Sequence, residues 1–332
     1  MNKHKITLLG AGSWGTAVAL HLARHHEVTL WGHSKSHIEA LKRDGENKQF
    51  LPGYSFPESL SASDDLDACL NQAHTVIIGV PSHAFAEVFE KINKISGPIT
   101  AGISWITKGI DPDTNTLLSQ TVASKWGKNT PMAILSGPSF AKEVARGLPT
   151  AITLASNDKA YGKALQQLFC DPQFRVYLSD DVIGVQLCGA VKNVLAIATG
   201  ISDGLGFGAN ARAALITRGL AEMTRLGTAI GANQQTFSGL AGLGDLVLTC
   251  TDDQSRNRRF GLAIGQGQET EIAEKNIGQV VEGKHNAYQV CGLAKQHKIS
   301  MPICQTILQI LERDITAQEA VHQLMTRPLK HE

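Results

Sequence analysis

Residues 5–16 read KITLLGAGSWGT, and this stretch decides the fold of the first half of the chain. The apolar run 6–9 predicts a buried strand, and glycines follow it at Gly10, Gly12 and Gly15. This G-x-G-x-x-G spacing, between a strand and a helix expected at 14–24, is typical of a turn that binds a dinucleotide pyrophosphate. The first glycine permits the tight turn, the second lets the main chain approach the pyrophosphate, and the third lets helix pack on strand. A purely structural glycine turn is the alternative.

Bulk composition excludes several classes of protein. The chain has 332 residues, which is enough for two domains, and its formal charge of +1 gives no reason to expect nucleic acid or a membrane surface as a partner. Its six cysteines are scattered without a C-x-x-C pair, which argues against disulfides or a zinc site and favours the cytoplasm. The first strand begins almost at once, which leaves no room for a signal peptide. The apolar stretch 182–202 carries a single charge, Lys192, and polar and small residues within it favour a buried core helix over a membrane span.

The first half alternates strands with helices. Its apolar runs are nearly continuous rather than alternating, which predicts a parallel sheet covered on both faces. Further strands are expected at residues 28–31, 75–80, 100–106, 132–135, 151–155 and 174–178, with helices at 84–92 and 159–169. The fold class is therefore α/β, a doubly wound sheet that reaches to about residue 180.

From residue 181 onward strand signals disappear and helical patterns take over. Helices are expected at 181–201, 209–226, 242–250, 257–264, 283–297, 302–313 and 317–325. We therefore predict two domains, a dinucleotide-binding domain over 1–180 and an all-helical substrate domain over 181–332. The crevice between them is the expected active site.

The end of the second strand bears on the choice of dinucleotide. A fold that selects NAD usually carries Asp or Glu there to hold the ribose 2′-hydroxyl. Here the sequence reads Trp31-Gly32-His33-Ser34-Lys35, without a carboxylate. This permits NADP, whose 2′-phosphate His33 and Lys35 would attract. The alternative is that His33 is merely a loop residue.

Two loops that follow later strands carry polar residues. Lys108, in ITKG, comes just after the strand 100–106, at the sheet edge where ligands bind, although a solvated loop lysine is the alternative. The segment SGPSF follows the next strand in the same way, and taken alone it is equally a helix entry capped by Ser136 or Ser139.

Lys192 is the sharpest candidate, because it is the only charge between Asp181 and Asp203. An ammonium group on so apolar a helix costs desolvation energy unless it has a polar partner or a ligand. It would suit a place beside a reacting carbonyl, where it can donate or take a proton. The alternative is a lysine that reaches the surface along its apolar stem.

Three later motifs complete the set. The turn SGLAGLGD delivers Asp245 to a helix start, where a cap is the alternative. SRNRR opens another helix with Arg256 in its first turn, which suits a phosphate, or is a solvated basic turn. Glu282 heads a later helix, where by itself it would complement the helix dipole.

Together these motifs resemble the bacterial-type NAD(P)-dependent glycerol-3-phosphate dehydrogenases. The likeness spans nearly the whole chain, and the matching segments are GAGSWGTA, LWGH, ITKG, LSGPSFAKEV, GAVKNVLAIATGISDGLG, GLAGLGDLVLTC, SRNRRFG and VVEG. The resemblance implies a Rossmann-type domain followed by a helical domain like the C-terminal domain of 6-phosphogluconate dehydrogenase. It implies reversible hydride transfer between NADP or NAD and C2 of dihydroxyacetone phosphate, giving sn-glycerol 3-phosphate for phospholipid synthesis in the cytoplasm.

The resemblance also implies roles for individual residues. Lys192 is the catalytic acid and base. The implied substrate contacts are Lys108, Gly137, Ser139, Lys192, Asp245, Ser255, Arg256 and Asn257, with Arg256 and Asn257 facing the phosphate. The implied cofactor contacts are Gly10, Gly12, Ser13, Trp14, Gly15, His33, Lys108, Ala141, Arg256, Val280 and Glu282. No metal is implied, and a homodimer through the helical domain is compatible with the sequence, in which no interface can be read.

Two alternatives remain open from the sequence. A related β-hydroxyacid or 6-phosphogluconate-type dehydrogenase shares the two-domain plan and a helix lysine. A non-catalytic nucleotide sensor would keep only the first half, and it would have no need of Lys192, Asp245 and Arg256 together.

Overall fold

The structure, a computed structural model, describes residues 4–99 and 101–326 and divides into two units. The first unit comprises Met1–Asp111 and Leu117–Gln186, and the second comprises Pro112–Thr116 and Leu187–Glu332. The expected division after residue 180 thus precedes the observed one by six residues. Thr100, the first residue of one predicted strand, lies outside the described residues.

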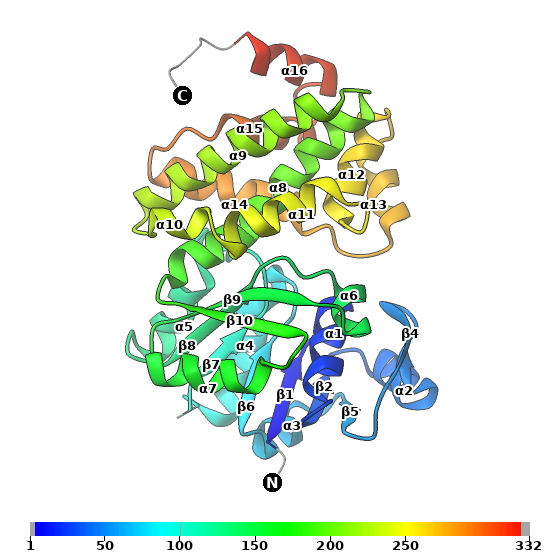
Figure 1. The fold of residues 1–332 in the computed structure, drawn as a ribbon, viewed down its shortest axis with the longest axis vertical. Helices are drawn as coiled ribbons and strands as arrows, with labels where there is room; N and C mark the ends of the chain where they lie inside the picture. Colours follow the sequence, from blue (N-terminus) through cyan, green and yellow to red (C-terminus); the bar gives the residue numbers. More distant parts are fainter. Residues whose placement is uncertain (1–3, 100, 327–332) are drawn as a thin grey trace. The chain divides into compact units, whose positions relative to one another are not determined.

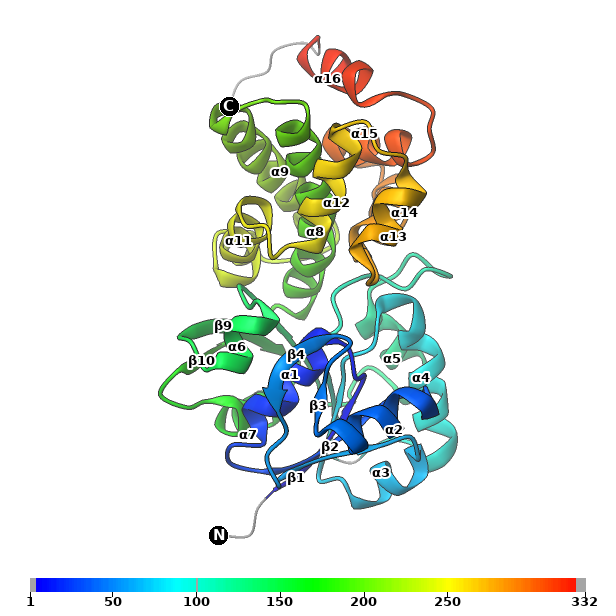
Figure 2. The same cartoon turned by 90° about the vertical axis from the view of Figure 1, so that its right-hand side faces the viewer.

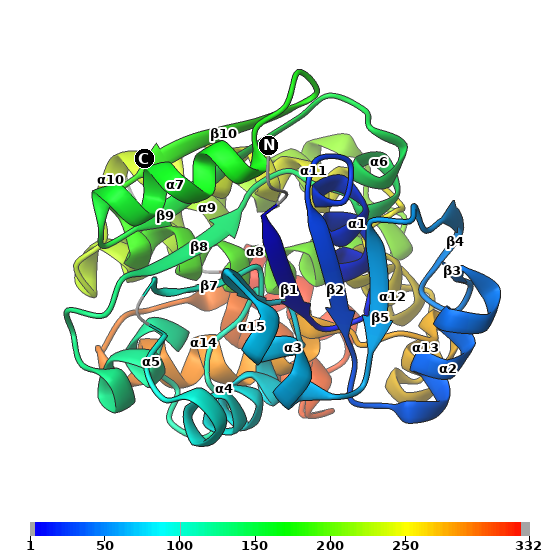
Figure 3. The same cartoon turned by 90° about the horizontal axis from the view of Figure 1, so that it is seen from below.

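The first unit is built on an eight-stranded sheet in the order β10-β9-β8-β7-β6-β1-β2-β5 (Figure 3). The strands are β1 (Lys5–Leu9), β2 (Glu27–Trp31), β5 (Leu60–Ser63), β6 (Thr75–Ile78), β7 (Ile103–Trp105), β8 (Met132–Ser136), β9 (Thr150–Ser156) and β10 (Phe174–Ser179). The order reverses at β1, which pairs with β2 on one side and β6 on the other. Ligands of doubly wound sheets bind at such a reversal, beyond the carboxyl end of the strand.

Strand direction departs from the sequence prediction at one place. The six strands from β8 to β5 in this order are mutually parallel, as predicted, but β9 runs antiparallel to β8, with Ala133 opposite Ser156. β10 is parallel to β9. The prediction of a wholly parallel sheet is therefore wrong for its last two strands. A continuous apolar run indicates that a strand is buried on both faces, but it does not indicate the direction in which the strand runs.

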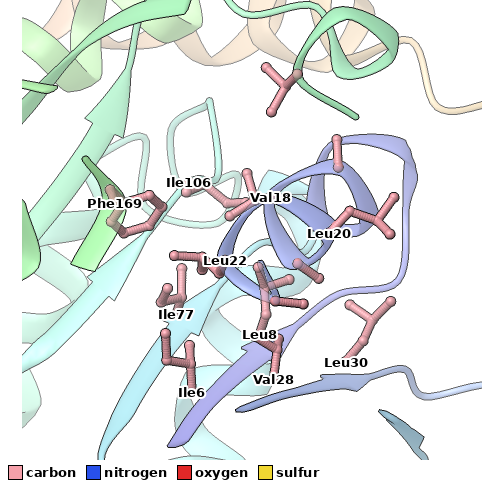
Figure 4. Close-up of a cluster of buried hydrophobic side chains, with 14 of the residues drawn as sticks. Ile6, Leu8, Val18, Leu20, Leu22, Val28, Leu30, Ile77, Ile106 and Phe169 are labelled. Atoms are coloured by element: carbon pink, nitrogen blue, oxygen red, sulfur yellow. The ribbon is translucent and has the colours of Figure 1, made fainter. Parts of the chain in front are cut away.

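Helices cover both faces of this sheet. α1 (Ser13–Leu22), α6 (Ala141–Arg146) and α7 (Lys159–Phe169) form one layer, and α3 (Leu66–Gln72), α4 (Ser82–Ser96) and α5 (Leu118–Trp126) form the other (Figure 3). Figure 4 shows Val18 and Leu22 of α1 packed over Ile6, Leu8 and the neighbouring strands. This core anchors the start of α1 directly above the end of β1.

The sequence did not predict a small outlying part of this unit. It consists of α2 (Lys35–Asp44) and a hairpin of β3 (Glu46–Asn47) and β4 (Leu51–Ser55). In Figure 2 the hairpin lies beside α1, and α2 lies beside the hairpin. We call residues 46–55 the β3–β4 hairpin. These strands are short and mostly polar, so no hydrophobic period indicates them.

The second unit is helical, as predicted (Figure 1). α8 (Val182–Gly204) begins within the first unit and continues into the second from Leu187 onward. The elements that follow are α9 (Ala209–Ala229), α10 (Gln234–Phe237), a π-helix (Leu240–Gly244), α11 (Asp245–Thr251), α12 (Arg256–Gly265), α13 (Thr270–Ile277), α14 (Glu282–Gln296), α15 (Pro302–Leu311) and α16 (Ala317–Met325). α8 is long and apolar enough to span a membrane, but its apolar window is 94% buried within the protein, as in a core helix.

Two helices of this unit meet with their main chains in contact. On α8, Gly200 and Gly204 face α12, and on α12, Gly261 and Gly265 face α8. A Cβ atom added at any of these four glycines would collide with a carbonyl oxygen of the other helix. α8 carries Lys192 and α12 begins at Arg256, so this crossing fixes the two helices on which the predicted catalytic and phosphate-binding residues stand.

Candidate active site

The glycine turn has the geometry that its spacing predicts. Gly10 has a φ of 126° and lies so close to β6 that a Cβ atom there would be 2.6 Å from the carbonyl carbon of Gly79. A Cβ atom at Gly15 would collide with the carbonyl oxygen of Gly10. These two glycines are therefore required by the protein's own packing, as predicted for the turn and for the helix–strand contact.

Gly12 is different, because a Cβ atom there would meet no other described residue within 4 Å. Its φ of −81° is also open to any residue. Packing within the protein gives no reason for a glycine here, whereas close approach of a ligand does. Next to it, the indole Nε1 of Trp14 is buried without a hydrogen-bond partner among the described residues. Both observations fit a dinucleotide pyrophosphate at the start of α1.

Ser13 is held by the protein itself. Its hydroxyl donates to the carbonyl oxygen of Phe50 in the β3–β4 hairpin, at 2.6 Å. The start of α1 is thus tied to a segment 37 residues further along the chain.

The end of β2 leads directly into α2. Ser34 caps this helix, with its hydroxyl accepting from the N–H of His37, and His33 and Lys35 on either side are exposed. The first turn of α2 holds no acidic residue. The local charge therefore suits a 2′-phosphate, and the role of His33 stays a prediction.

Lys108 and the loop after β8 form one cluster. Lys108 is half-buried, and its Nζ donates to the carbonyl oxygen of Gly137 at 3.3 Å. The hydroxyl of Ser139 donates to the same oxygen at 2.9 Å. Gly137 is buried with a φ of 153°, and a Cβ atom there would press on Ile152 of β9. Three of the predicted substrate contacts are thus brought together.

This loop does lead into a helix, as the alternative held, but the expected serine cap is wrong. α6 begins at Ala141, its N-cap is Phe140, and no side chain caps it. Ser139 is engaged with Gly137 instead, and the buried hydroxyl of Ser136 has no hydrogen-bond partner among the described residues. A buried hydroxyl left in this state is unusual in a protein interior, and it adds Ser136 to the polar groups of the cluster.

In the second unit Lys192 is buried, with 6% of its surface exposed, and it does not extend to solvent. Its Nζ donates to Oδ1 of Asp245 at 2.7 Å and to the hydroxyl of Thr249 at 2.9 Å. Thr249 in turn donates to the main-chain carbonyl of Asp245. The ammonium group therefore has the polar partners that its burial demands.

The helix that carries Asp245 begins irregularly. The sequence predicted one helix over 242–250, but residues 240–244 form a π-helix and α11 starts at Asp245, with Gly244 as its N-cap. A Cβ atom at Gly242 would collide with the main chain of Phe237, so the turn depends on a glycine there. π-helical turns often occur at functional sites. Asp245 is not a cap, because its carboxylate pairs with Lys192.

Arg256 stands at the first position of α12. Its Nη1 donates to Oε1 of Gln279 at 2.9 Å, and burial lowers the pKa of its guanidinium, a shift that the charge of Glu282 opposes. Arg256 therefore brings the segment 279–282 to the start of α12. Val280, within that segment, is 37% exposed. A helix start with a basic side chain suits an anion.

The neighbours of Arg256 have structural roles. Ser255 is the N-cap of α12 and accepts from the N–H of Arg258. The amide nitrogen of Asn257 donates to Asn193 at 2.9 Å, and its amide oxygen accepts from the N–H of Gly283 at 2.9 Å. Asn257 therefore joins α12 to α8 and α14, and a role toward a phosphate stays a prediction.

Each unit thus contains some of the predicted site residues. Sequence reasoning missed Ser136, Asn193, Thr249 and Gln279, which directly contact or adjoin predicted ones. One signal was present for Thr249, which follows Asp245 by four residues and so shares its helix face.

Comparison with known proteins gives the same result for the whole chain. The family description "NAD-dependent glycerol-3-phosphate dehydrogenase N-terminus" matches residues 5–162, and the corresponding C-terminus description matches residues 181–322. A glycerol-3-phosphate dehydrogenase [NAD(P)+] of Legionella pneumophila is 62% identical over 100% of both chains. That of Colwellia psychrerythraea is 53% identical over 99% of this chain and 98% of its own. A crystal structure of glycerol-3-phosphate dehydrogenase from Coxiella burnetii superposes with a TM-score of 0.95 at 52% identity, covering 98% of this chain and 99% of that one.

The fold and the comparisons define an NAD(P)-dependent oxidoreductase with a Rossmann-type unit and a helical unit. More particularly, the chain belongs to the NAD-dependent glycerol-3-phosphate dehydrogenase family. The resemblance read from the sequence motifs is confirmed.

Proposed function

We propose that this chain catalyses the reversible reduction of dihydroxyacetone phosphate to sn-glycerol 3-phosphate with NADPH or NADH. The observation that carries this proposal is the buried cluster of Lys192, Asp245 and Thr249. A positive proton donor held in an apolar helix is what the reduction of a ketone requires, because negative charge develops on the carbonyl oxygen.

The nicotinamide, when bound, would supply the hydride for C2, or accept it in the reverse direction. Lys192 gives a proton from Nζ to the C2 oxygen during reduction and takes it back during oxidation. Asp245 and Thr249 hold that Nζ in place and give the buried ammonium group its polar partners. The remaining substrate contacts would be Lys108, Gly137, Ser139, Asp245, Ser255, Arg256 and Asn257.

Arg256 would anchor the phosphate at a distance from the reacting carbon. Its guanidinium is charged, and the start of α12 adds the positive end of the helix dipole. Binding energy gained at the phosphate helps to orient C2 beside Lys192.

The cofactor would lie along the carboxyl end of β1 and β2. Its contacts would be Gly10, Gly12, Ser13, Trp14, Gly15, His33, Lys108, Ala141, Arg256, Val280 and Glu282. Two observations support this placement, the open space at Gly12 and the indole of Trp14, which has no hydrogen-bond partner in the part of the chain that the structure describes. In the cell we propose a cytoplasmic enzyme that supplies sn-glycerol 3-phosphate for phospholipid synthesis and acts as a homodimer.

The test is an assay of NADPH oxidation at 340 nm (the absorbance of the reduced nicotinamide) with purified protein. We expect turnover with dihydroxyacetone phosphate and little with unphosphorylated dihydroxyacetone. Equal rates with both ketones would contradict the phosphate site. Turnover with a β-hydroxyacid or 6-phosphogluconate instead would favour the related dehydrogenases, and NADPH binding without turnover would favour a sensor.

A further inference from the structure

The strongest unassigned feature is a single buried side chain, Asn47, in the β3–β4 hairpin. It is completely buried, with 0% of its surface exposed. Nδ2 donates to the carbonyl oxygen of Ala11 at 2.9 Å and to the hydroxyl of Thr16 at 2.8 Å. Ala11 is inside the glycine turn and Thr16 is in the first turns of α1, so one amide group holds both parts of the pyrophosphate site.

The other side of the same amide faces the hairpin and α2. Oδ1 accepts from the N–H of Phe50 at 3.2 Å and lies 3.2 Å from Nε2 of His37. The orientation of the amide is fixed, because a carbonyl oxygen can only accept and a main-chain N–H can only donate. His37 must therefore donate through Nε2. Asn47 makes all four of the hydrogen bonds that a carboxamide can form.

The hairpin reaches the rest of the predicted cofactor site through two more bonds. The carbonyl of Phe50 accepts from Ser13, and the hydroxyl of Tyr54 donates to the carbonyl of Lys142 in α6 at 3.1 Å. Lys142 adjoins Ala141, a predicted cofactor contact. The hairpin thus touches the glycine turn, α2 beyond the end of β2, and α6.

We propose that Asn47 is a positioning residue for the dinucleotide, which it holds indirectly by fixing the glycine turn to the hairpin and to α2. The carbonyl of Ala11 is turned toward Asn47, and this aligns the N–H groups that follow it with the pyrophosphate. The inference rests on the proposed function, since it requires that the turn binds a dinucleotide. Because the pyrophosphate is common to both cofactors, Asn47 acts on NADPH and NADH alike.

The test uses the full chain with Asn47→Asp and Asn47→Ala. Asn47→Asp keeps the shape and the acceptor for Phe50, but sets an oxygen against the carbonyl oxygen of Ala11. We expect Kd for NADPH and NADH, measured by calorimetry, to rise by the same factor, about tenfold, which is the effect of roughly one lost hydrogen bond. At saturating cofactor, kcat and KM for dihydroxyacetone phosphate should change little.

Asn93→Ala is the matched control. Asn93 belongs to the same unit and lies near the C-terminal end of α4, away from the glycine turn. Its Oδ1 accepts a hydrogen bond from the indole of Trp126 on α5. This variant should leave both dissociation constants unchanged. Thr16→Ala, which withdraws only one partner of Nδ2, should raise both constants by a smaller equal factor, and it remains informative if the Asn47 variants do not fold.

Three results would overturn the inference. The first is unchanged cofactor affinity in the Asn47 and Thr16 variants. The second is a loss of cofactor affinity in Asn93→Ala as large as that in the Asn47 variants. The third is a change confined to kcat or to KM for the ketone. If the wild-type protein binds neither dinucleotide, the proposed function itself is wrong. If the wild-type protein binds both and the variants bind them equally well, only the inference about Asn47 is wrong.

Discussion

Nζ of Lys192 on α8 lies 2.7 Å from Oδ1 of Asp245 on α11, and both side chains are almost wholly buried. Removing one partner of a buried ion pair leaves the other charge uncompensated, which costs about 3–5 kcal/mol. The pair is therefore a structural contact as well as a chemical one, and the two roles need separate measurements.

We predict that Lys192→Ala lowers kcat by a factor of about 10² to 10⁴, the usual contribution of a positioned acid or base. The dissociation constant for NADPH should change little, because Lys192 is not among the proposed cofactor contacts. Steady-state kinetics and calorimetry on protein shown to be folded by circular dichroism would check this. Lys284→Ala, which removes a lysine paired with Glu274, is the control. Near-normal turnover in Lys192→Ala would contradict the assigned role.

Arg256→Ala should raise KM for dihydroxyacetone phosphate by about 10- to 100-fold, because a charged hydrogen bond contributes about 1.5–3 kcal/mol. Arg259→Ala, an exposed arginine on the same helix, should leave KM nearly unchanged. Initial rates over a range of ketone concentrations measure both. Equal changes in the two variants would indicate a general charge effect instead of a phosphate contact.

Gly12→Ala and Gly15→Ala should separate binding from stability. Alanine fits at position 12 within the protein, so the melting temperature of Gly12→Ala should equal that of wild type while its Kd for NADPH rises. Alanine at Gly15 collides with the carbonyl of Gly10, so unfolding in urea should show a loss of about 1–3 kcal/mol. If Gly12→Ala binds NADPH as tightly as wild type, the pyrophosphate does not approach that position.

His33→Asp should change the preference between cofactors. A carboxylate beyond β2 would repel a 2′-phosphate and accept from a 2′-hydroxyl, so Kd for NADPH should rise and Kd for NADH should fall. Parallel titrations measure the ratio. A ratio equal to that of wild type would remove His33 from the cofactor site.

Glu222 on α9 should make stability depend on pH. Burial raises the pKa of its carboxyl to about 7, although the N–H groups of Ile303 and Cys304 donate to it. Because this pKa is raised, the stabilising contribution of Glu222 is complete below about pH 4.5 and is lost as the pH rises through about 7. The free energy of unfolding should fall by about 3 kcal/mol over that range. In urea titrations, the free energy of unfolding of Glu222→Gln relative to wild type should therefore increase as the pH rises from 4.5 to 8. A constant difference across that range would show that Glu222 does not titrate there.

Residues with a strong local signal could be predicted from the sequence. The glycine turn, the buried strands and the helical second half follow from spacing and periodicity, and Lys192 was visible as a lone charge on an apolar helix. Asp245 and Arg256 were visible as unusual residues at helix starts. Each of these signals lies within a few positions of the chain.

Features that depend on distant partners could not be predicted. Asn47 is an ordinary polar residue in a polar segment, and its importance comes from bonds to Ala11 and Thr16, more than 30 positions away. The antiparallel direction of β9 is likewise set by pairing with β8, because the composition of a buried strand is the same in either direction.

The contact of α8 with α12 through four glycines has a consequence for substrate choice. Main-chain contacts cannot adjust as side chains do, so the main chains of the two helices that carry Lys192 and Arg256 are held at a fixed spacing. Under the roles proposed for Lys192 and Arg256, a ketone whose phosphate is one carbon nearer or farther should fit one group less well than the other. Substitutions of neighbouring side chains would therefore leave the two helices in place, and we expect them to change the choice of ketone little.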